Sequence, residues 1–421
     1  MSRDGASEKK YSLAQNAWMN TAGTLVYYVC QWAVSMVVVR LSTDENVGML
    51  QLAMTVTNVF MAVALYNMRP YQVSDVRDDY TAGQYTASRI LTCALAMAGC
   101  AVYSICWGYG GRSFWCIQLY MIYRINEAAA DVLHGVDQKH DRMDHVGISQ
   151  AVRGVLMLLV FTLLIRWTDN ILISVAAMAC VTLLFAAVYD VSRAGRYDDL
   201  RPDFRGDAVR RLLWACLPGA LASIAVTSIV TVPRQYLAQM EGEIILGYYA
   251  TVATPLVFLQ VLVNSVISPA VGSLSRAAER EDRRAFVSLT GKLLALILAF
   301  SGAVFLGVCL LGEWGMVLLF GEKIRPYVSW MYAVVGCVAA FAVCSLGQQL
   351  LIVLRSMREL LLFSVLALLV SACTGKALIR LAGPDGVSMC VTLSYLLFAL
   401  LSMGKTALLV RRWNPAQSAD G

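Results

Sequence analysis

The chain alternates long apolar runs with shorter polar breaks along nearly its whole length. Each run holds about 20 residues with few charges, which suffices for one α-helix to cross the hydrocarbon core of a bilayer. Short segments of alternating polarity, typical of outer-membrane β-strands, do not occur. We therefore predict an all-α polytopic membrane protein with about twelve transmembrane helices, over residues 16–39, 48–67, 88–108, 114–132, 146–166, 170–189, 213–232, 246–268, 291–311, 327–347, 360–379 and 386–407.

Composition agrees with this interpretation, since 58% of the 421 residues are hydrophobic and only 15% are charged. The first apolar run is too long for the core of a signal peptide, so we expect it to remain as the first helix. The twelve cysteines lie in or beside apolar runs without a Cys-x-x-Cys pair. This placement favours packing between helices over disulfide formation or metal binding.

The distribution of basic residues predicts the orientation of the chain. An even number of spans places both termini on one side, and that side holds about 24 Lys and Arg residues against about 8 on the other. Both termini are therefore expected in the cytoplasm. Because the charge excess lies in these loops, the net charge of +6 requires no nucleic-acid partner.

The longest polar break divides the chain into two sets of six helices. Residues 190–212 form a predicted cytoplasmic linker between an N-lobe at 16–189 and a C-lobe at 213–407. Residues 1–15 and 408–421 are then cytoplasmic tails.

The halves also resemble one another weakly. The stretches GMLQLAMTVTNVF at 48–60 and GYYATVATPLVF at 247–258 each follow an acidic turn. Two six-helix repeats in the same orientation would place a central cavity between two bundles.

Charged residues inside the apolar runs are the strongest indication of a functional site. Arg124, Glu127 and Asp131 occur at i, i+3 and i+7 of one run, so they share a helix face, and Arg153 lies about two turns into the next run. A charge at bilayer depth costs several kcal/mol, so it is retained where it faces a bundle interior or a wet cavity.

A polar turn is expected between these two helices, at residues 133–144. Three histidines, His134, His140 and His145, fall in or beside it. We interpret them as part of a solvated cytoplasmic loop rather than a metal site, because no fourth ligand of suitable type is fixed nearby.

Five stretches carry a resemblance to a known family: Lys9-Lys10 before NAWMNTAG at 16–23, MRPYQVSDV at 68–76, residues 135–154 with Gln138, Arg142 and Arg153, residues 243–255, and LFGEKI at 319–324. Together they resemble the polysaccharide-transporter (Wzx-type) branch of the multidrug/oligosaccharidyl-lipid/polysaccharide (MOP) exporter superfamily. Each motif is loose, and the resemblance lies in the whole set. It implies a V-shaped, MATE-like bundle of two six-helix lobes that works by alternating access.

The resemblance further implies a flippase that moves undecaprenyl-pyrophosphate-linked oligosaccharide across the bacterial cytoplasmic (inner) membrane for surface polysaccharide, such as lipopolysaccharide. The expected partners are that lipid-linked sugar, the bilayer, and the polymerase and glycosyltransferases of the same pathway. We expect no cofactor, and coupling to a proton or sodium gradient stays open.

The chemistry of such a substrate suggests roles for the buried charges. Arg124 is the favoured pyrophosphate contact, because a guanidinium stays charged and binds two oxygens at once. Glu127 would tune Arg124 or carry a proton. Arg153 is either a second contact or the structural partner of Glu127 or Asp131. Amide side chains add candidate sugar contacts, with interhelical hydrogen bonds as the alternative, at Asn20, Asn58, Gln260 and Asn264.

Three other function classes remain. A cation-coupled multidrug exporter of the same superfamily commonly carries a carboxylate in its first or seventh helix; neither 16–39 nor 213–232 has one, although Glu127 keeps this class open. A membrane glycosyltransferase or polysaccharide polymerase needs a sizeable external loop, which is missing from the predicted topology. No Gly-rich phosphate loop with a lysine occurs, which argues against ATP hydrolysis. Buried charge on the fourth helix speaks against a scaffold without transport.

Overall fold

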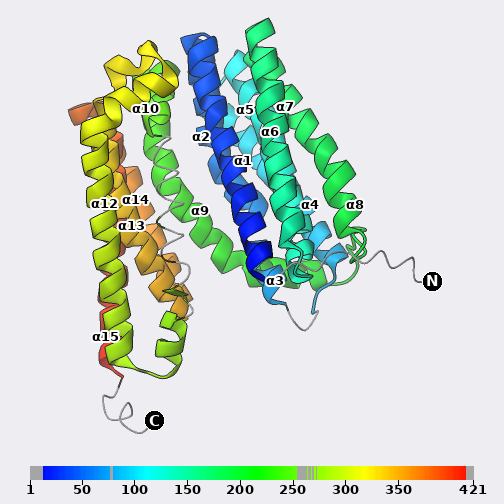
Figure 1. Cartoon of the computed structure of the whole chain (residues 1–421), viewed down its shortest axis with the longest axis vertical. Helices are drawn as coiled ribbons and strands as arrows, with labels where there is room; N and C mark the ends of the chain where they lie inside the picture. Colours follow the sequence, from blue (N-terminus) through cyan, green and yellow to red (C-terminus); the bar gives the residue numbers. More distant parts are fainter. Residues whose placement is uncertain are drawn as a thin grey trace. The chain divides into compact units, whose positions relative to one another are not determined.

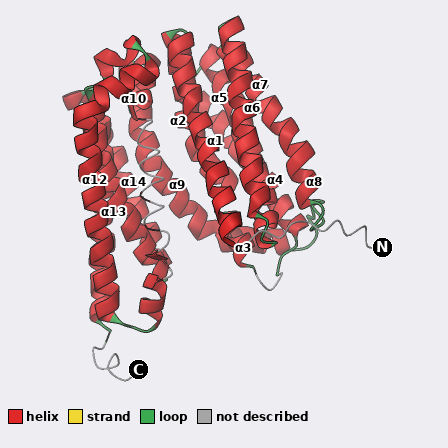
Figure 2. Ribbon diagram, viewed as in Figure 1, coloured by secondary structure: helices red, strands yellow, loops and turns green. Residues whose placement is uncertain are grey.

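The computed structural model describes residues 13–75, 79–253 and 273–413, and of residues 254–272 it describes 263, 267, 270 and 271. Every regular element in this part of the chain is helical (Figures 1 and 2). The helices are α1 (Leu13–Leu41), α2 (Asp44–Leu65), α3 (Met68–Ser74), α4 (Ala82–Cys106), α5 (Gly111–Lys139), α6 (Met143–Thr168), α7 (Ile171–Phe185), the π-helical turn η1 (Ala186–Asp190), α8 (Val191–Ala194), α9 (Ala208–Glu241), α10 (Glu243–Ala253), α12 (Arg283–Phe320), the 3₁₀ turn η2 (Glu322–Tyr327), α13 (Trp330–Val353), α14 (Met357–Ala382) and α15 (Asp385–Arg411).

The helices coincide with the predicted spans. Ten helices of the described residues are long and apolar enough to cross a membrane. The charged helix α5 coincides with the predicted span 114–132, and α10 with the first part of 246–268, most of whose remainder lies outside the described residues. The protein is therefore an all-α multi-pass membrane protein, as the hydrophobic pattern predicts.

The polar turn predicted at 133–144 is largely helical, because α5 continues to Lys139. His134 and His145 are buried, with 3% and 4% of their surface exposed, so the prediction of a solvated loop is wrong for both. The reason is local pairing of polar groups: the Nδ1 atom of His145 lies 3.5 Å from a carboxylate oxygen of Asp137. His140 is partly exposed.

Contacts within the chain define two compact units. Unit 1 comprises Met1–Val34, Val63–Tyr103 and Gln118–Cys216, and unit 2 comprises Ser35–Ala62, Ser104–Ile117 and Leu217–Gly421. The second unit thus includes one end of α1, most of α2 and the start of α5, in addition to the helices from α10 onwards.

In unit 1, α1 and α6 pack backbone to backbone. A Cβ atom on Gly23 would overlap the carbonyl of Gly147, and a Cβ atom on Gly154 would lie 2.9 Å from the Cα atom of Tyr27. Small residues let membrane helices approach this closely, and Gly147 and Gly154 stand two turns apart on one face of α6. The close approach brings Tyr27 against α6.

In unit 2, the similar stretches of the two halves meet. A Cβ atom on Gly247 of α10 would lie 2.9 Å from the Cα atom of Gly48 of α2, so equivalent positions of the weak repeat pack on one another. Nearby, the Nε atom of Arg40 donates to the carbonyl of Leu319 at 2.7 Å, at the C-terminal end of α12. These contacts tie α1 and α2 to the second half of the chain within unit 2.

Candidate functional site

Charged and polar side chains from four helical elements meet inside unit 1. The group comprises Tyr27 from α1, Arg124 and Glu127 from α5, Arg153 from α6 and Asp190 from η1. We refer to these five residues as the charge cluster. Sequence analysis selects three of them, Arg124, Glu127 and Arg153, and the fold places all three together.

Arg124 and Glu127 form the more accessible part of the charge cluster. The Nη1 atom of Arg124 lies 2.6 Å from a carboxylate oxygen of Glu127, and the two side chains are 16% and 9% exposed. The Tyr27 hydroxyl donates to the same carboxylate and lies 2.5 Å from the hydroxyl of Tyr123. Glu127 is thus held from two sides, while Arg124 uses one nitrogen in the hydrogen bond to Glu127.

Arg153 and Asp190 form the deeper part. Their side chains are 4% and 2% exposed, and Arg153 Nη1 lies 3.8 Å from Asp190 Oδ2. The Arg153 guanidinium also lies over the Tyr27 ring, 5.9 Å from its centroid. Asp190 ends the π-helical turn, a local widening of the helix that is often found at functional sites. Its other carboxylate oxygen lies 3.5 Å from Nε2 of His134.

The ion pair between Arg153 and Asp190 is incomplete. Among the described residues, Arg153 Nε and Nη1 and Asp190 Oδ2 have no hydrogen-bond partner, although all three atoms are buried. Buried polar atoms without hydrogen-bond partners are unfavourable. A further polar group that hydrogen-bonded to these atoms would therefore stabilise this part of the charge cluster.

Asp131 belongs to a different ion network. Its carboxylate lies 2.9 Å from Arg89 Nη2 and 3.2 Å from Arg69 Nη1. The second Arg89 nitrogen, Nη1, donates to the carbonyl of Ala64 at 2.6 Å. Asp131 is therefore not the partner of Arg153, and its part in substrate binding stays a prediction.

The predicted amide contacts are dispersed. Asn20 is half-buried on α1 in unit 1, whereas Asn58 is exposed on α2 in unit 2. Gln260 and Asn264 lie outside the described residues. Their roles as sugar contacts stay predictions.

Two members of the charge cluster were not selected from the sequence. Tyr27 lies in an apolar run, and Asp190 was assigned to the linker that follows the sixth run. Charge balance in the sequence could have indicated Asp190. It directly adjoins an apolar run, so its carboxylate can neutralise an arginine on a neighbouring helix. Glycines at 23, 147 and 154 were a second signal for the close approach of α1 and α6.

The formal charges of the charge cluster balance one another. It contains two guanidinium groups and two carboxylates, which balance when Glu127 and Asp190 are both ionised. Protonation of Glu127 would leave one positive charge in excess, at Arg124, the more exposed arginine. Among the described residues, no group of three or more His, Cys, Asp or Glu side chains could hold a metal ion.

Comparison with known proteins gives the fold a class. The chain matches no protein-family model. The capsular polysaccharide biosynthesis protein CapF of Staphylococcus aureus is 22% identical over 304 residues, which cover 70% of this chain and 74% of that protein. An inward-facing structure of a multidrug resistance MATE family transporter of the MOP superfamily aligns with a TM-score of 0.72 at 10% identity, covering 97% of this chain and all of the other. The lipid II flippase MurJ, in an inward closed conformation, aligns with a TM-score of 0.72 at 10% identity, covering 93% and 87%.

The chain thus has the fold of MOP-superfamily transporters, which is the fold that the resemblance in the sequence implies. The aligned structures are those of a membrane transporter and of a lipid flippase.

Proposed function

We propose that this protein is a flippase that moves an undecaprenyl-pyrophosphate-linked oligosaccharide from the cytoplasmic to the outer leaflet of a bacterial cytoplasmic membrane, for surface polysaccharide. Three observations support the proposal: the transporter fold, the likeness to a protein named for capsular polysaccharide biosynthesis, and the fold shared with a lipid II flippase. The observation that carries it is the Arg124–Glu127 pair, with Arg153 behind it, inside the helices of unit 1.

The diphosphate and hydroxyl groups of such a substrate cannot cross hydrocarbon unaided. Arg124 is the first contact in this proposal, because its side chain is more exposed than that of Arg153. One guanidinium nitrogen binds Glu127, so the remaining nitrogens can meet a phosphate in a two-point contact. Arg153, with two unpartnered nitrogens, adds positive potential behind this contact.

Glu127 controls the strength of this contact in the proposed mechanism. While ionised, it competes with the substrate diphosphate for Arg124. When it binds a proton, the Arg124 guanidinium is released to the diphosphate. Substrate binding and proton uptake would therefore favour one another, which makes a proton gradient the proposed source of coupling.

Flipping in reconstituted vesicles tests the proposal. A short undecaprenyl-pyrophosphate sugar with a fluorescent label is added with the protein, and a membrane-impermeant quencher reports which leaflet holds the label. We expect protein-dependent exchange that falls about 100-fold in Arg124→Ala, if one charge-assisted two-point contact worth about 3 kcal/mol is lost. Arg124→Lys should recover part of the activity, because it keeps the charge and loses the fork geometry.

The matched control is Arg166→Ala, which removes an exposed arginine from α6 outside the charge cluster and should flip normally. Full flipping activity of Arg124→Ala would be consistent with a flippase but would show that Arg124 is not its substrate contact. Failure of the wild-type protein to flip any lipid-linked sugar, together with efflux of an organic cation, would assign the chain to the multidrug class.

A further inference from the structure

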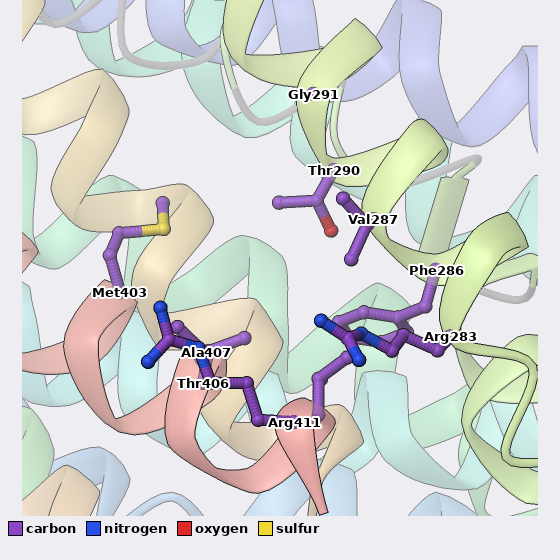
Figure 3. Close-up of a pocket in the computed structure, with 10 residues that line it drawn as sticks. Arg283, Phe286, Val287, Thr290, Gly291, Met403, Thr406, Ala407 and Arg411 are labelled. Atoms are coloured by element: carbon purple, nitrogen blue, oxygen red, sulfur yellow. The ribbon is translucent and has the colours of Figure 1, made fainter. Parts of the chain in front are cut away.

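A second feature lies in unit 2, where α12 and α15 line a largely apolar cavity of about 340 Å³ that also carries a few polar groups. Figure 3 shows the side chains of its two walls. They include Arg283, Phe286 and Thr290 from α12 and Met403, Thr406 and Arg411 from α15.

The two arginines occupy one end of both helices. Arg283 is the first residue of α12, and Arg411 is the last residue of α15. At 1.5 Å per residue, they lie about 12 Å and about 6 Å beyond the predicted spans, so their long side chains can reach the level of the lipid headgroups. This is also the side that the positive-inside pattern predicts to be cytoplasmic.

Neither arginine is neutralised by a residue that the structure describes. Within the described residues, no carboxylate forms an ion pair with Arg283 or Arg411. The neighbouring cation Lys405, by contrast, is paired with Glu359 at 2.6 Å. Asp282, next to Arg283, accepts the backbone N–H of Ala285 as the N-cap of α12. Two guanidinium groups on one cavity therefore lack a counter-charge from the described part of the chain.

Two threonine hydroxyls inside the cavity also lack partners. The oxygen atoms of Thr290 and Thr406 are buried without a hydrogen bond to any described residue, and Thr406 is only 6% exposed. A buried hydroxyl without a partner is unfavourable, so both are available to an oxygen-rich ligand. The remaining wall is apolar, with Phe286 and Met403 among its residues.

We propose that this cavity binds one anionic phospholipid of the surrounding bilayer, with its phosphate between Arg283 and Arg411 and its glycerol and ester oxygens near Thr290 and Thr406. Basic pockets between transmembrane helices on the cytoplasmic side are a known way to bind anionic headgroups. The bound phosphate supplies the missing counter-charge and links α12 to α15.

The size of the cavity distinguishes a phospholipid from the substrate lipid. The cavity volume of about 340 Å³ lies at the low end of the range of about 300–1,000 Å³ that is usual for small-molecule sites. It suits a phosphate and a glycerol backbone, whereas a diphosphate with several sugars is larger. The acyl chains would continue along α12, whose apolar side chains are widely exposed, for example Val287 at 55% and Leu296 at 52%.

Native mass spectrometry of the purified full-length protein tests this inference. The protein in detergent is titrated with palmitoyl-oleoyl phosphatidylglycerol and, separately, with the phosphatidylcholine of the same chains. We expect one phosphatidylglycerol to bind about tenfold more tightly than phosphatidylcholine. Each charge-assisted contact to phosphate is worth about tenfold, so Arg283→Gln/Arg411→Gln should weaken phosphatidylglycerol binding about 100-fold.

The matched control is Arg280→Gln/Arg284→Gln, which removes the same charge from the turn before α12 and from its first turn, at residues that do not line the cavity. It should retain the bound lipid. A second variant fills the cavity: Gly291 lines it, and a Cβ atom there would meet no atom within 4 Å, so Gly291→Phe should fold and exclude the lipid. Gly307→Phe, at an equally open position of α12, is its control.

Three results would overturn the proposal. The first is equal phosphatidylglycerol binding by the wild type and the Arg283→Gln/Arg411→Gln variant, and the second is equal binding of phosphatidylcholine. The third is displacement of phosphatidylglycerol by an equal concentration of undecaprenyl pyrophosphate in the wild type, since this would assign the cavity to the transported lipid. None of these results depends on whether the protein flips its substrate.

Discussion

Replacing Asp131 with asparagine should destabilise the protein strongly, because a buried arginine depends on this carboxylate. Arg89 is 2% exposed and lies 2.9 Å from Asp131, while Arg69 lies 3.2 Å away on the other side. Removing one partner of a buried ion pair costs about 3–5 kcal/mol. Asp131 and Arg69 are 18% and 24% exposed, so water screens part of this loss. We expect the free energy of unfolding to fall by about 2–3 kcal/mol.

The measurement is unfolding of the purified protein in detergent by a denaturant, followed by tryptophan fluorescence. Glu127→Gln is the matched comparison, since it makes the same chemical change on the same helix. Its partner Arg124 is more exposed than Arg89, so the expected loss is smaller, about 1–2 kcal/mol. The flipping activity should change more in Glu127→Gln than in Asp131→Asn, which is the reverse of the order expected for stability.

A double substitution measures the interaction between Arg89 and Asp131 separately from the other effects of each substitution on stability. In Arg89→Met/Asp131→Asn the buried charge is removed together with its partner, so the combined loss should be smaller than the sum of the two single losses by at least about 1 kcal/mol. If Asp131→Asn unfolds within about 0.5 kcal/mol of the wild type and loses flipping, the structural assignment fails. Asp131 would then belong to the substrate contacts.

Three further predictions address other parts of the chain. Gly147→Leu should destabilise the protein by about 1–3 kcal/mol in the same unfolding assay, because a Cβ atom there would overlap the Met19 carbonyl; Gly302→Leu, at an open position, should have little effect. Tyr27→Phe removes a hydroxyl that donates to Glu127. It should alter the pH dependence of flipping while the unfolding free energy falls by about 1 kcal/mol, and an unchanged pH profile would exclude Tyr27 from proton handling. A reporter enzyme active only in the cytoplasm, fused to the C-terminus, should be active, and an inactive fusion would reverse the predicted orientation.

The hydrophobic pattern was sufficient to predict the class of the fold and the positions of the helices. A membrane helix must satisfy its backbone hydrogen bonds internally and keep apolar side chains toward lipid, so its length and polarity are properties of one continuous segment. The pattern failed at 133–144 because part of this stretch is buried and makes polar contacts within unit 1. His134 is hydrogen-bonded to Ser149, and a hydropathy profile cannot register such pairing.

The same reasoning explains the partial success at the candidate site. Arg124, Glu127 and Arg153 were selected because a charge within an apolar run is costly wherever it points. Their partners were not, because Tyr27 and Asp190 come from helices far away in the sequence.

Only the tertiary structure decided which ion pairs form, since pairing depends on helix rotation and on close approach at positions such as Gly147. It assigned Asp131 to Arg69 and Arg89, and Arg153 to Asp190. Helix positions follow from local burial along the chain, whereas ion partners follow from a packing geometry shared by distant segments.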